Sequence, residues 1–257
     1  MKPTDYPHIN TLLDVLLAQM QAILGDKLVG LYLYGSLVTG DFDDTVSDID
    51  LLAAIADDLN EQEFLALQAM HDKLALTYPE RKDRIEIAYL SLHALKTFKT
   101  QASPIGIISP GEPFHIVQAG KEWLMNWYMV RTIGKTLFGP TPDTIIDLIS
   151  QAEFVEAIKN HVLAWREYIK DVERRPSQAY AILTMCRGLY TTRNGEQVSK
   201  VRAASWAKNE LPEWAGLIDK ALQWRLAWRD SNVDPAATLD DTRRFVNSVI
   251  DLVEISD

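Results

Sequence analysis

Apolar residues recur along the first ninety positions at two different spacings, which together predict alternating helices and strands. A stripe with the helical period runs through residues 8–24 and stops at Gly25. The next segments predict two buried strands, a helix and an alternating strand, at residues 28–34, 49–55, 59–77 and 84–90. The order strand, strand, helix, strand predicts a small mixed α/β sheet with flanking helices.

The pattern changes in the second half of the chain. Residues 109–115 are rich in Gly and Pro and predict a turn between two short strands, and a helix is expected over 122–137. From about residue 143 onward every segment has helical period. We therefore expect an α/β domain over residues 1–150, followed by an all-helical domain over residues 151–257.

Several residues predict where the helices of the second domain begin and end. A helix over 177–190 should end at a turn formed by Asn194 and Gly195, and Ser199 is expected to cap the next helix. Thr238 and Asp241 have the spacing of a capping box for the last helix.

Composition and charge narrow the class of protein. The chain has 257 residues, is 47% apolar and 24% charged, and contains a single cysteine, Cys186. One cysteine excludes an internal disulfide framework, which together with the absence of an apolar leader predicts a cytoplasmic protein. The net charge of −10 argues against nucleic acid as a partner, because nucleic-acid binding depends on neutralising phosphates. The negative net charge also mildly favours a cationic substrate.

One segment concentrates polar residues between two apolar runs. The first run ends in Gly35 and Ser36, and the second opens with Ser47, Asp48, Ile49 and Asp50. If the second run is a strand, Asp48 and Asp50 point from the same face, because strand side chains alternate. Two carboxylates about 6 Å apart repel by roughly 3 kcal/mol at an effective dielectric near 20, so the arrangement suits a bound cation.

The chemistry of this segment suggests which cation. Oxygen ligands suit Mg²⁺, which is usually held by one or two carboxylates together with the phosphates of a nucleotide. Gly35 allows the backbone to approach phosphates closely, and Ser36 and Ser47 supply donors to them. The alternative is a Gly-Ser turn followed by a strand whose exposed face happens to carry two acids.

This pattern resembles the signature of the DNA polymerase β-like nucleotidyltransferases: Gly-Ser after one strand, a short loop, then Asp-x-Asp on the next strand. The resemblance implies a third acid, and Glu86 on the strand 84–90 is the candidate. It is expected to act as a general base toward an acceptor hydroxyl and to lie near the metal as a third ligand beside Asp48 and Asp50. An edge-strand Glu86 paired with Arg84 is the structural alternative, and Asp83 and Glu80 are the other candidates for the base.

The helical half resembles the C-terminal domain of the aminoglycoside adenylyltransferases, in particular the streptomycin/spectinomycin group. The resemblance rests on Leu183-Thr-Met-Cys-Arg-Gly-Leu-Tyr190, Gly195-Glu-Gln-Val-Ser-Lys200 and the segment from Ala203 to Pro212. In that family the matching Arg and Lys contact the nucleotide's phosphates, which implies this role for Arg187 and Lys200.

The chain departs from the family pattern where the acceptor should bind. The family's Gly-Glu-Trp, whose Trp packs on the drug, matches Gly111-Glu112-Pro113 here, with Phe114 and His115 following. At the position of Ser177 the family has an Asp. The resemblance implies an acceptor site between the domains, against residues 111–115 and 177–180. We expect that site to be rebuilt and not to suit streptomycin or spectinomycin.

The sequence therefore predicts a monomeric enzyme that uses ATP and Mg²⁺ to transfer AMP to the hydroxyl of a small acceptor. Neither nucleic acid nor a membrane is an expected partner. Two alternatives stay open. One is an adenylyltransferase for another metabolite or a protein side chain, and the other is a regulatory protein that binds a nucleotide without transferring it.

Overall fold

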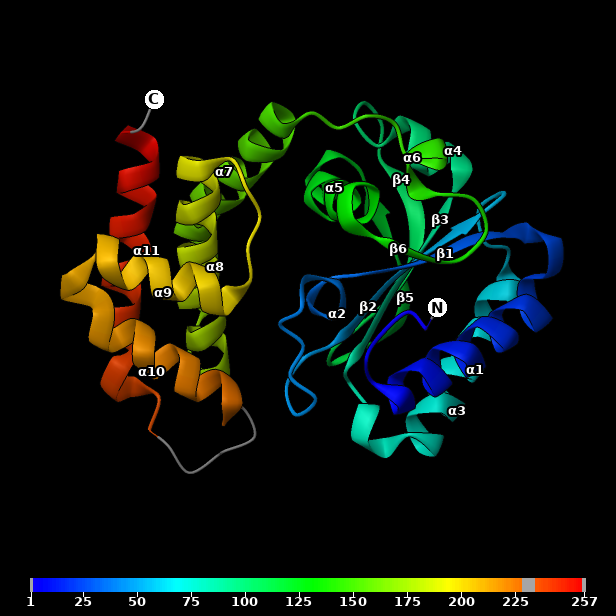
Figure 1. Ribbon diagram of the computed structural model, residues 1–257, viewed down its shortest axis with the longest axis horizontal. Helices are drawn as coiled ribbons and strands as arrows, with labels where there is room; N and C mark the ends of the chain where they lie inside the picture. The colour runs from blue at the N-terminus through cyan, green and yellow to red at the C-terminus, as the bar shows by residue number, and fades with distance from the viewer. Residues whose placement is uncertain (1, 228–233, 256–257) are drawn as a thin grey trace. The chain divides into compact units, whose positions relative to one another are not determined.

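A computed structural model of the protein describes residues 2–227 and 234–255. These residues divide into two compact units (Figure 1). The first unit holds residues 1–42 and 47–149, and the second holds residues 43–46 and 150–257. None of the helices in the described ranges is both long enough and apolar enough to cross a membrane.

The first unit is built on a six-stranded mixed sheet with the order β5-β4-β3-β2-β1-β6. β2 and β3 are parallel, and every other neighbouring pair is antiparallel. The strands are β1 (Leu28–Tyr34), β2 (Ile49–Ile55), β3 (Ile85–Ser91), β4 (Ser103–Ser109), β5 (Glu112–Ala119) and β6 (Lys135–Phe138). The helices are α1 (Pro7–Leu24), α2 (Ser36–Thr39), α3 (Glu61–Thr77), α4 (Leu92–Thr97), α5 (Leu124–Ile133) and α6 (Pro142–Ile145).

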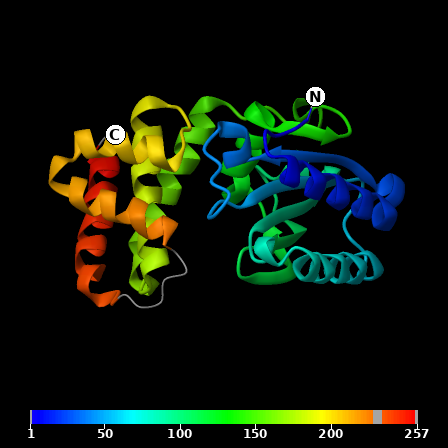
Figure 2. The same ribbon diagram turned by 60° about the horizontal axis from the view of Figure 1, so that its bottom comes forward.

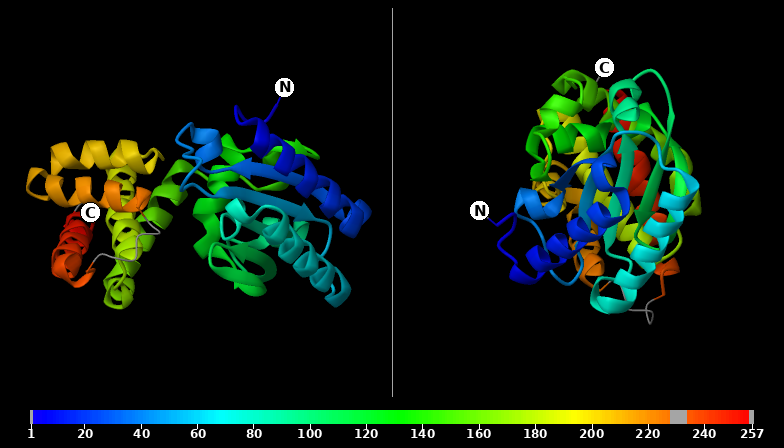
Figure 3. Two further views of the ribbon diagram at one scale, coloured as in Figure 1. Left: turned by 90° about the horizontal axis from the view of Figure 1, so that it is seen from below. Right: turned by 90° about the vertical axis from the view of Figure 1, so that its right-hand side faces the viewer.

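The helices α1 and α3 lie side by side on one face of the sheet, and α5 lies on the other (Figures 1, 2 and 3). The apolar stripe of α1 is buried against Leu31, Leu33, Leu51 and Ile87 of the three central strands. Side chains at the alternate positions of these strands point toward the face of α5. The predicted α/β sheet is thus confirmed.

Two segments of the first unit differ from the sequence-based expectation. The helix predicted over 122–137 ends at Ile133, and residues 135–138 form β6 on the edge of β1. Gly134 has a backbone ψ of 139°, which ends the helix and starts the strand. The pairing partner of β6 is about a hundred positions earlier in the chain, so a local pattern could not reveal it. The loop after Gly35 also contains one short helical turn, α2.

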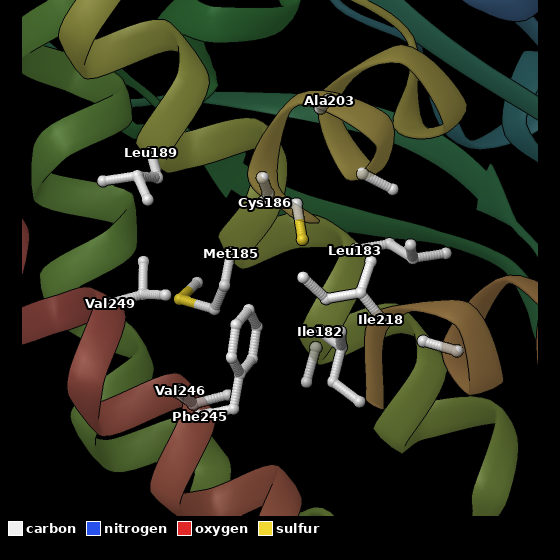
Figure 4. Packing of buried hydrophobic residues seen from close by; sticks show 14 of the residues in the cluster. Ile182, Leu183, Met185, Cys186, Leu189, Ala203, Ile218, Phe245, Val246 and Val249 are labelled. Atoms are coloured by element: carbon white, nitrogen blue, oxygen red, sulfur yellow. The ribbon is translucent and has the colours of Figure 1, made fainter. Parts of the chain in front are cut away.

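The second unit is helical, as predicted. Its helices are α7 (Gln151–Tyr168), α8 (Arg175–Asn194), α9 (Lys200–Glu210), α10 (Ala215–Leu226) and α11 (Ala236–Ile255). Helix α8 runs through the middle, and its side chains Ile182, Met185 and Leu189 pack among Phe245, Val246 and Val249 of α11 and residues of the other helices (Figure 4). Cys186 is fully buried in this core, and burial raises the pKa of its thiol to about 12.

Helix ends in the second unit follow local capping chemistry. Ser150 and Glu153 form a capping box that begins α7, Gly195 ends α8 in the left-handed conformation, and Ser199 caps α9 as predicted. The capping box expected at Thr238 is wrong. Helix α11 begins at Ala236, and the Thr238 hydroxyl donates to Gln178 Oε1 at 2.8 Å.

Candidate functional site

Three polar side chains lie in a row across the central strands of the first unit. Tyr34 at the end of β1 is paired with Asp50 near the start of β2, and Asp50 is paired with Glu86 near the start of β3. Neighbouring strands are about 4.8 Å apart, and directly paired residues share a face. The pairing therefore brings Tyr34, Asp50 and Glu86 together at one end of the sheet.

All three side chains point away from the core formed with α1 and α3. Their strand neighbours Leu33, Leu51 and Ile87 fill that core, and side chains alternate along each strand. The carboxylates of Asp50 and Glu86 are half-buried, whereas Tyr34 is buried. Two neighbouring carboxylates that are partly buried from solvent repel each other, and this repulsion favours binding of a cation between them.

Gly35 brings the backbone into contact with Asp50. Its φ of 69° and ψ of −150° are open to glycine but strained for other residues. A Cβ atom at this position would lie 2.7 Å from the Asp50 carboxyl carbon, and closer still to Oδ2. Ser36 begins the short helix α2 directly after this turn. Gly35 is thus the residue that lets the chain turn over the Asp50 carboxylate.

The segment that carries Asp48 is fixed to the start of β3. Arg84 is buried, and its guanidinium donates to the Ser47 carbonyl at 2.6 Å. The Ile49 amide donates to the Arg84 carbonyl at 3.0 Å. Ser47 is itself buried, and Asp48 is half-buried two residues before Asp50. These contacts hold Asp48 at the same end of the sheet as Asp50.

Glu86 does not lie on an edge strand, because β3 is paired on both sides, with β2 and β4. Its carboxylate is 3.5 Å from the hydroxyl of Tyr34, which donates to Oε1. Asn126 of α5 in turn donates to the Tyr34 hydroxyl at 3.5 Å. Burial, followed by the charges of Glu86 and Asp50, raises the pKa of Tyr34 well above its ordinary value, so the phenol keeps its proton.

Tyr34 and Asn126 were not singled out by the sequence. Tyr34 stands directly before Gly35, at the end of an apolar strand. Its hydroxyl group at that position was the one sequence feature that could have marked it as a site residue. Asn126 lies inside an apolar helix, and nothing in its neighbourhood marks it. Of the other candidates for the base, Glu80 lies in the short 3-10 helix Pro79–Arg81 and Asp83 lies two residues before β3, and both are exposed.

The described residues contain no cluster of three or more His, Cys, Asp or Glu side chains close enough to hold a metal ion by themselves. A metal at Asp48 and Asp50 would need further ligands from a bound molecule. Mg²⁺ is commonly bound in this way, through one or two carboxylates and the phosphates of a nucleotide. The half-buried oxygen ligands of this site fit such an ion.

The two cations proposed for phosphate binding belong to the second unit. Arg187 lies on α8 and is half-buried. Burial, followed by the charge of Arg187, lowers the pKa of His161. Lys200 is the first residue of α9, and its ammonium lies 5.2 Å from the ring centre of Tyr180. Ser177 lies in the first turn of α8 and is also half-buried.

The structure does not bring Phe114 to the acids. Its side chain is 4% exposed and stacks on Phe64 with ring centres 4.9 Å apart. It also contacts Tyr89, which lies in the core beneath α3, on the opposite face of the sheet from Glu86. Phe114 is therefore a core residue, and we remove it from the candidate acceptor site. Phe114 was predicted to lie in the acceptor site because it follows the match to the family's drug-binding motif, and a motif position does not say which face of the sheet a side chain lies on.

His115 lies on the same face of the sheet as Glu86. It is paired with Ile107, which is paired with Ala88, two residues after Glu86. Its Nε2 atom is 3.7 Å from the Glu112 carboxylate, and Glu112 is exposed. His115 and Glu112 thus form a polar pair on the edge strand β5, two strands away from the acid row.

The contact between Gly35 and Asp50 gives a testable expectation. Gly35→Ala should lower the free energy of unfolding by about 1–3 kcal/mol more than Gly40→Ala. Both variants carry the cost of a positive φ, but only at Gly35 would the added methyl group overlap the Asp50 carboxylate. Gly40 is a matched control, since its φ of 83° is also positive but a Cβ there would meet nothing within 4 Å. Denaturant unfolding measures both variants. Adding Asp50→Ala should recover part of the Gly35→Ala loss, and a loss unchanged by that addition would contradict the contact.

Two protein-family models match different parts of the chain. Residues 15–103 match the model of a nucleotidyltransferase domain, and residues 144–251 match the model of the aminoglycoside adenylyltransferase C-terminal domain. The first match contains the segment from Gly35 to Asp50 and also Glu86. The second contains Arg187 and Lys200.

Comparison with solved structures supports the fold. A spectinomycin adenyltransferase from Enterococcus faecialis, solved with ATP and spectinomycin, has a TM-score of 0.75 at 17% identity. The match covers 94% of this chain and 98% of that one. A toxin–antitoxin structure with AMP-PNP is 22% identical, with 60% of this chain and 93% of that one covered. Its TM-score of 0.29 does not indicate a shared overall fold.

Proposed function

Because this chain joins a nucleotidyltransferase domain to an aminoglycoside adenylyltransferase C-terminal domain, it is an aminoglycoside adenylyltransferase-like nucleotidyltransferase, and we propose that it transfers AMP from ATP to a hydroxyl of a small acceptor. The observation that carries the proposal is the pairing of Asp50 with Glu86 on adjacent parallel strands. This pairing supports the proposal, because the acid proposed to bind the cation lies beside the acid proposed to act as the base.

In the proposed reaction, Glu86 takes the proton of the acceptor hydroxyl, whose oxygen attacks the α-phosphorus of ATP. The bond to the bridging oxygen breaks and pyrophosphate leaves. Asp48 and Asp50 would hold Mg²⁺, which when bound neutralises charge on the phosphates. Gly35 leaves room for the nucleotide's phosphates beside Asp50, and Ser36 and Ser47 donate to them.

Arg187 and Lys200 are proposed to add positive charge to the triphosphate, which carries more negative charge than one Mg²⁺ balances. This assignment rests on the family resemblance of α8 and α9. Glu112, His115 and Ser177 are proposed as acceptor contacts. The pair of Glu112 with His115 supports this, because a carboxylate beside an imidazole suits a cationic, hydroxylated molecule.

Incubation with α-labelled ATP and Mg²⁺ tests the proposal. The panel should contain aminoglycosides, aminocyclitols including spectinomycin, other hydroxylated metabolites and candidate proteins. We expect label to move to a small acceptor, with one pyrophosphate released per transfer. Binding of Mg·ATP without transfer to any member of the panel would indicate a nucleotide-binding regulatory protein. Label on a protein would indicate the protein-modifying alternative.

Streptomycin is expected to be a poor acceptor. The chain has Pro113 and Ser177 where the resembling family places a Trp that stacks on the drug and an Asp that binds its cation. A hydrogen bond to a charged group contributes about 1.5–3 kcal/mol, and the aromatic contact adds to this. At about 1.4 kcal/mol per tenfold, streptomycin binding should be weaker by at least two orders of magnitude than in enzymes with both residues. Efficient adenylylation at micromolar streptomycin would contradict this expectation.

A further inference from the structure

We propose that Tyr34 is a positioning residue for Glu86, and that Asn126 holds Tyr34 in place. The inference rests on the proposed role of Glu86 as the base. Three elements meet in this chain of contacts: α5 supplies Asn126, β1 supplies Tyr34 and β3 supplies Glu86.

The direction of each hydrogen bond follows from the groups involved. The amide nitrogen of Asn126 can only donate, so the Tyr34 oxygen accepts from it at 3.5 Å. A phenol has one proton, and the Glu86 carboxylate can only accept, so that proton points to Oε1, also at 3.5 Å. Tyr34 is 5% exposed, which leaves its hydroxyl little access to competing water.

Fixing one oxygen of a carboxylate orients the other. The contact of Oε1 with the Tyr34 hydroxyl restricts rotation of the Glu86 carboxyl group and so sets the direction in which Oε2 points. A base must lie within hydrogen-bond reach of the proton that it abstracts, so this restriction favours transfer. Tyr34 itself does not need to touch the nucleotide or the acceptor.

A spectroscopic experiment tests the contact without using activity. In protein labelled at the ζ-carbon of tyrosine, Tyr34→Phe assigns the Tyr34 resonance. Glu86→Gln and Asn126→Ala should each shift that resonance and leave the Tyr32 resonance in place. Tyr32 is the matched internal control, because it is buried on the same strand and face and donates to the Pro140 carbonyl at 2.9 Å. A Tyr34 resonance that neither variant moves would overturn the proposal.

Kinetics test the consequence. Tyr34→Phe, which removes only the hydroxyl, should lower kcat by about 10- to 100-fold, the usual effect of losing a group that orients a reacting side chain. The KM for ATP should stay the same, and Tyr32→Phe should retain the wild-type kcat. In the Glu86→Gln background, Tyr34→Phe should cause little further loss, because the two residues act as one unit.

Three kinetic outcomes would overturn the proposal: an unchanged kcat in Tyr34→Phe, an equal loss in Tyr32→Phe, or a full additional loss in the double variant. If the wild-type protein transfers no AMP, the proposed function fails. The resonance of Tyr34 then still decides whether the hydroxyl holds Glu86.

Discussion

Glu86→Gln is expected to lower the turnover number of AMP transfer by about 10²–10⁴-fold, the usual contribution of a positioned base, with little change in affinity for Mg·ATP. The amide has nearly the shape of the carboxylate and can still accept the bond from Tyr34, so the local fold should persist. It cannot take a proton from the acceptor. Single-turnover rates with labelled ATP measure the chemical step, and calorimetry measures nucleotide affinity.

Glu80→Gln is the matched control for this variant. Glu80 is exposed on the short 3-10 helix Pro79–Arg81, and its conversion to Gln makes the same chemical change away from the acid row. It should behave as wild type. A loss of Mg·ATP affinity in Glu86→Gln would assign Glu86 to the metal first. A large loss of turnover in Glu80→Gln alone would make Glu80 the base.

Asp50→Asn is expected to abolish Mg²⁺-dependent binding of ATP, and Asp48→Asn should do the same. Each variant removes one of the two carboxylates proposed to hold the ion, and Mg²⁺ binds a neutral amide poorly in competition with water. Removing a charge from a repelling pair does not cost stability, so thermal unfolding should occur at or above the wild-type temperature. Calorimetric titration with ATP, with and without Mg²⁺, measures the effect.

Asp57→Asn provides the control for both. Asp57 follows β2 at its opposite end and is exposed, so its loss changes the net charge equally without touching the site. Unchanged Mg·ATP affinity in Asp48→Asn and Asp50→Asn would refute the metal assignment. A loss of affinity of equal size in Asp57→Asn would show that overall charge is the cause.

The parts of the fold that local sequence encodes were predictable. The strands β1 and β2 lie at residues 28–34 and 49–55, as the apolar runs indicated, because a run of buried residues bounded by turn residues defines both ends of a strand. The cap at Ser199 and the glycine at the end of α8 followed from the same local chemistry. The motif from Gly35 to Asp50 directed attention to the end of the sheet where Tyr34, Asp50 and Glu86 lie side by side.

What depends on contacts between distant segments was not predictable. Residues 135–138 continue a helical pattern, and only the free edge of β1 makes them a strand. Phe114 was a candidate acceptor residue because it follows Gly111-Glu112-Pro113, which matches the family's drug-binding motif, but the register of β5 turns it toward Phe64. Asn126 became relevant only when α5 was found against β1. In each case the deciding partner is far away in the sequence.

The position of β6 has a consequence for how the nascent chain acquires its fold. β1 emerges from the ribosome early, whereas the strand that covers its outer edge is among the last parts of the first unit to be made. At about 5–20 residues per second, synthesis of the roughly one hundred residues between β1 and β6 takes about 5 to 20 seconds, during which that edge has no partner. An uncovered strand edge is a template for pairing with other chains. We therefore expect the outer edge of β1 to be the part of the sheet most exposed to pairing with other chains while the first unit is being synthesised.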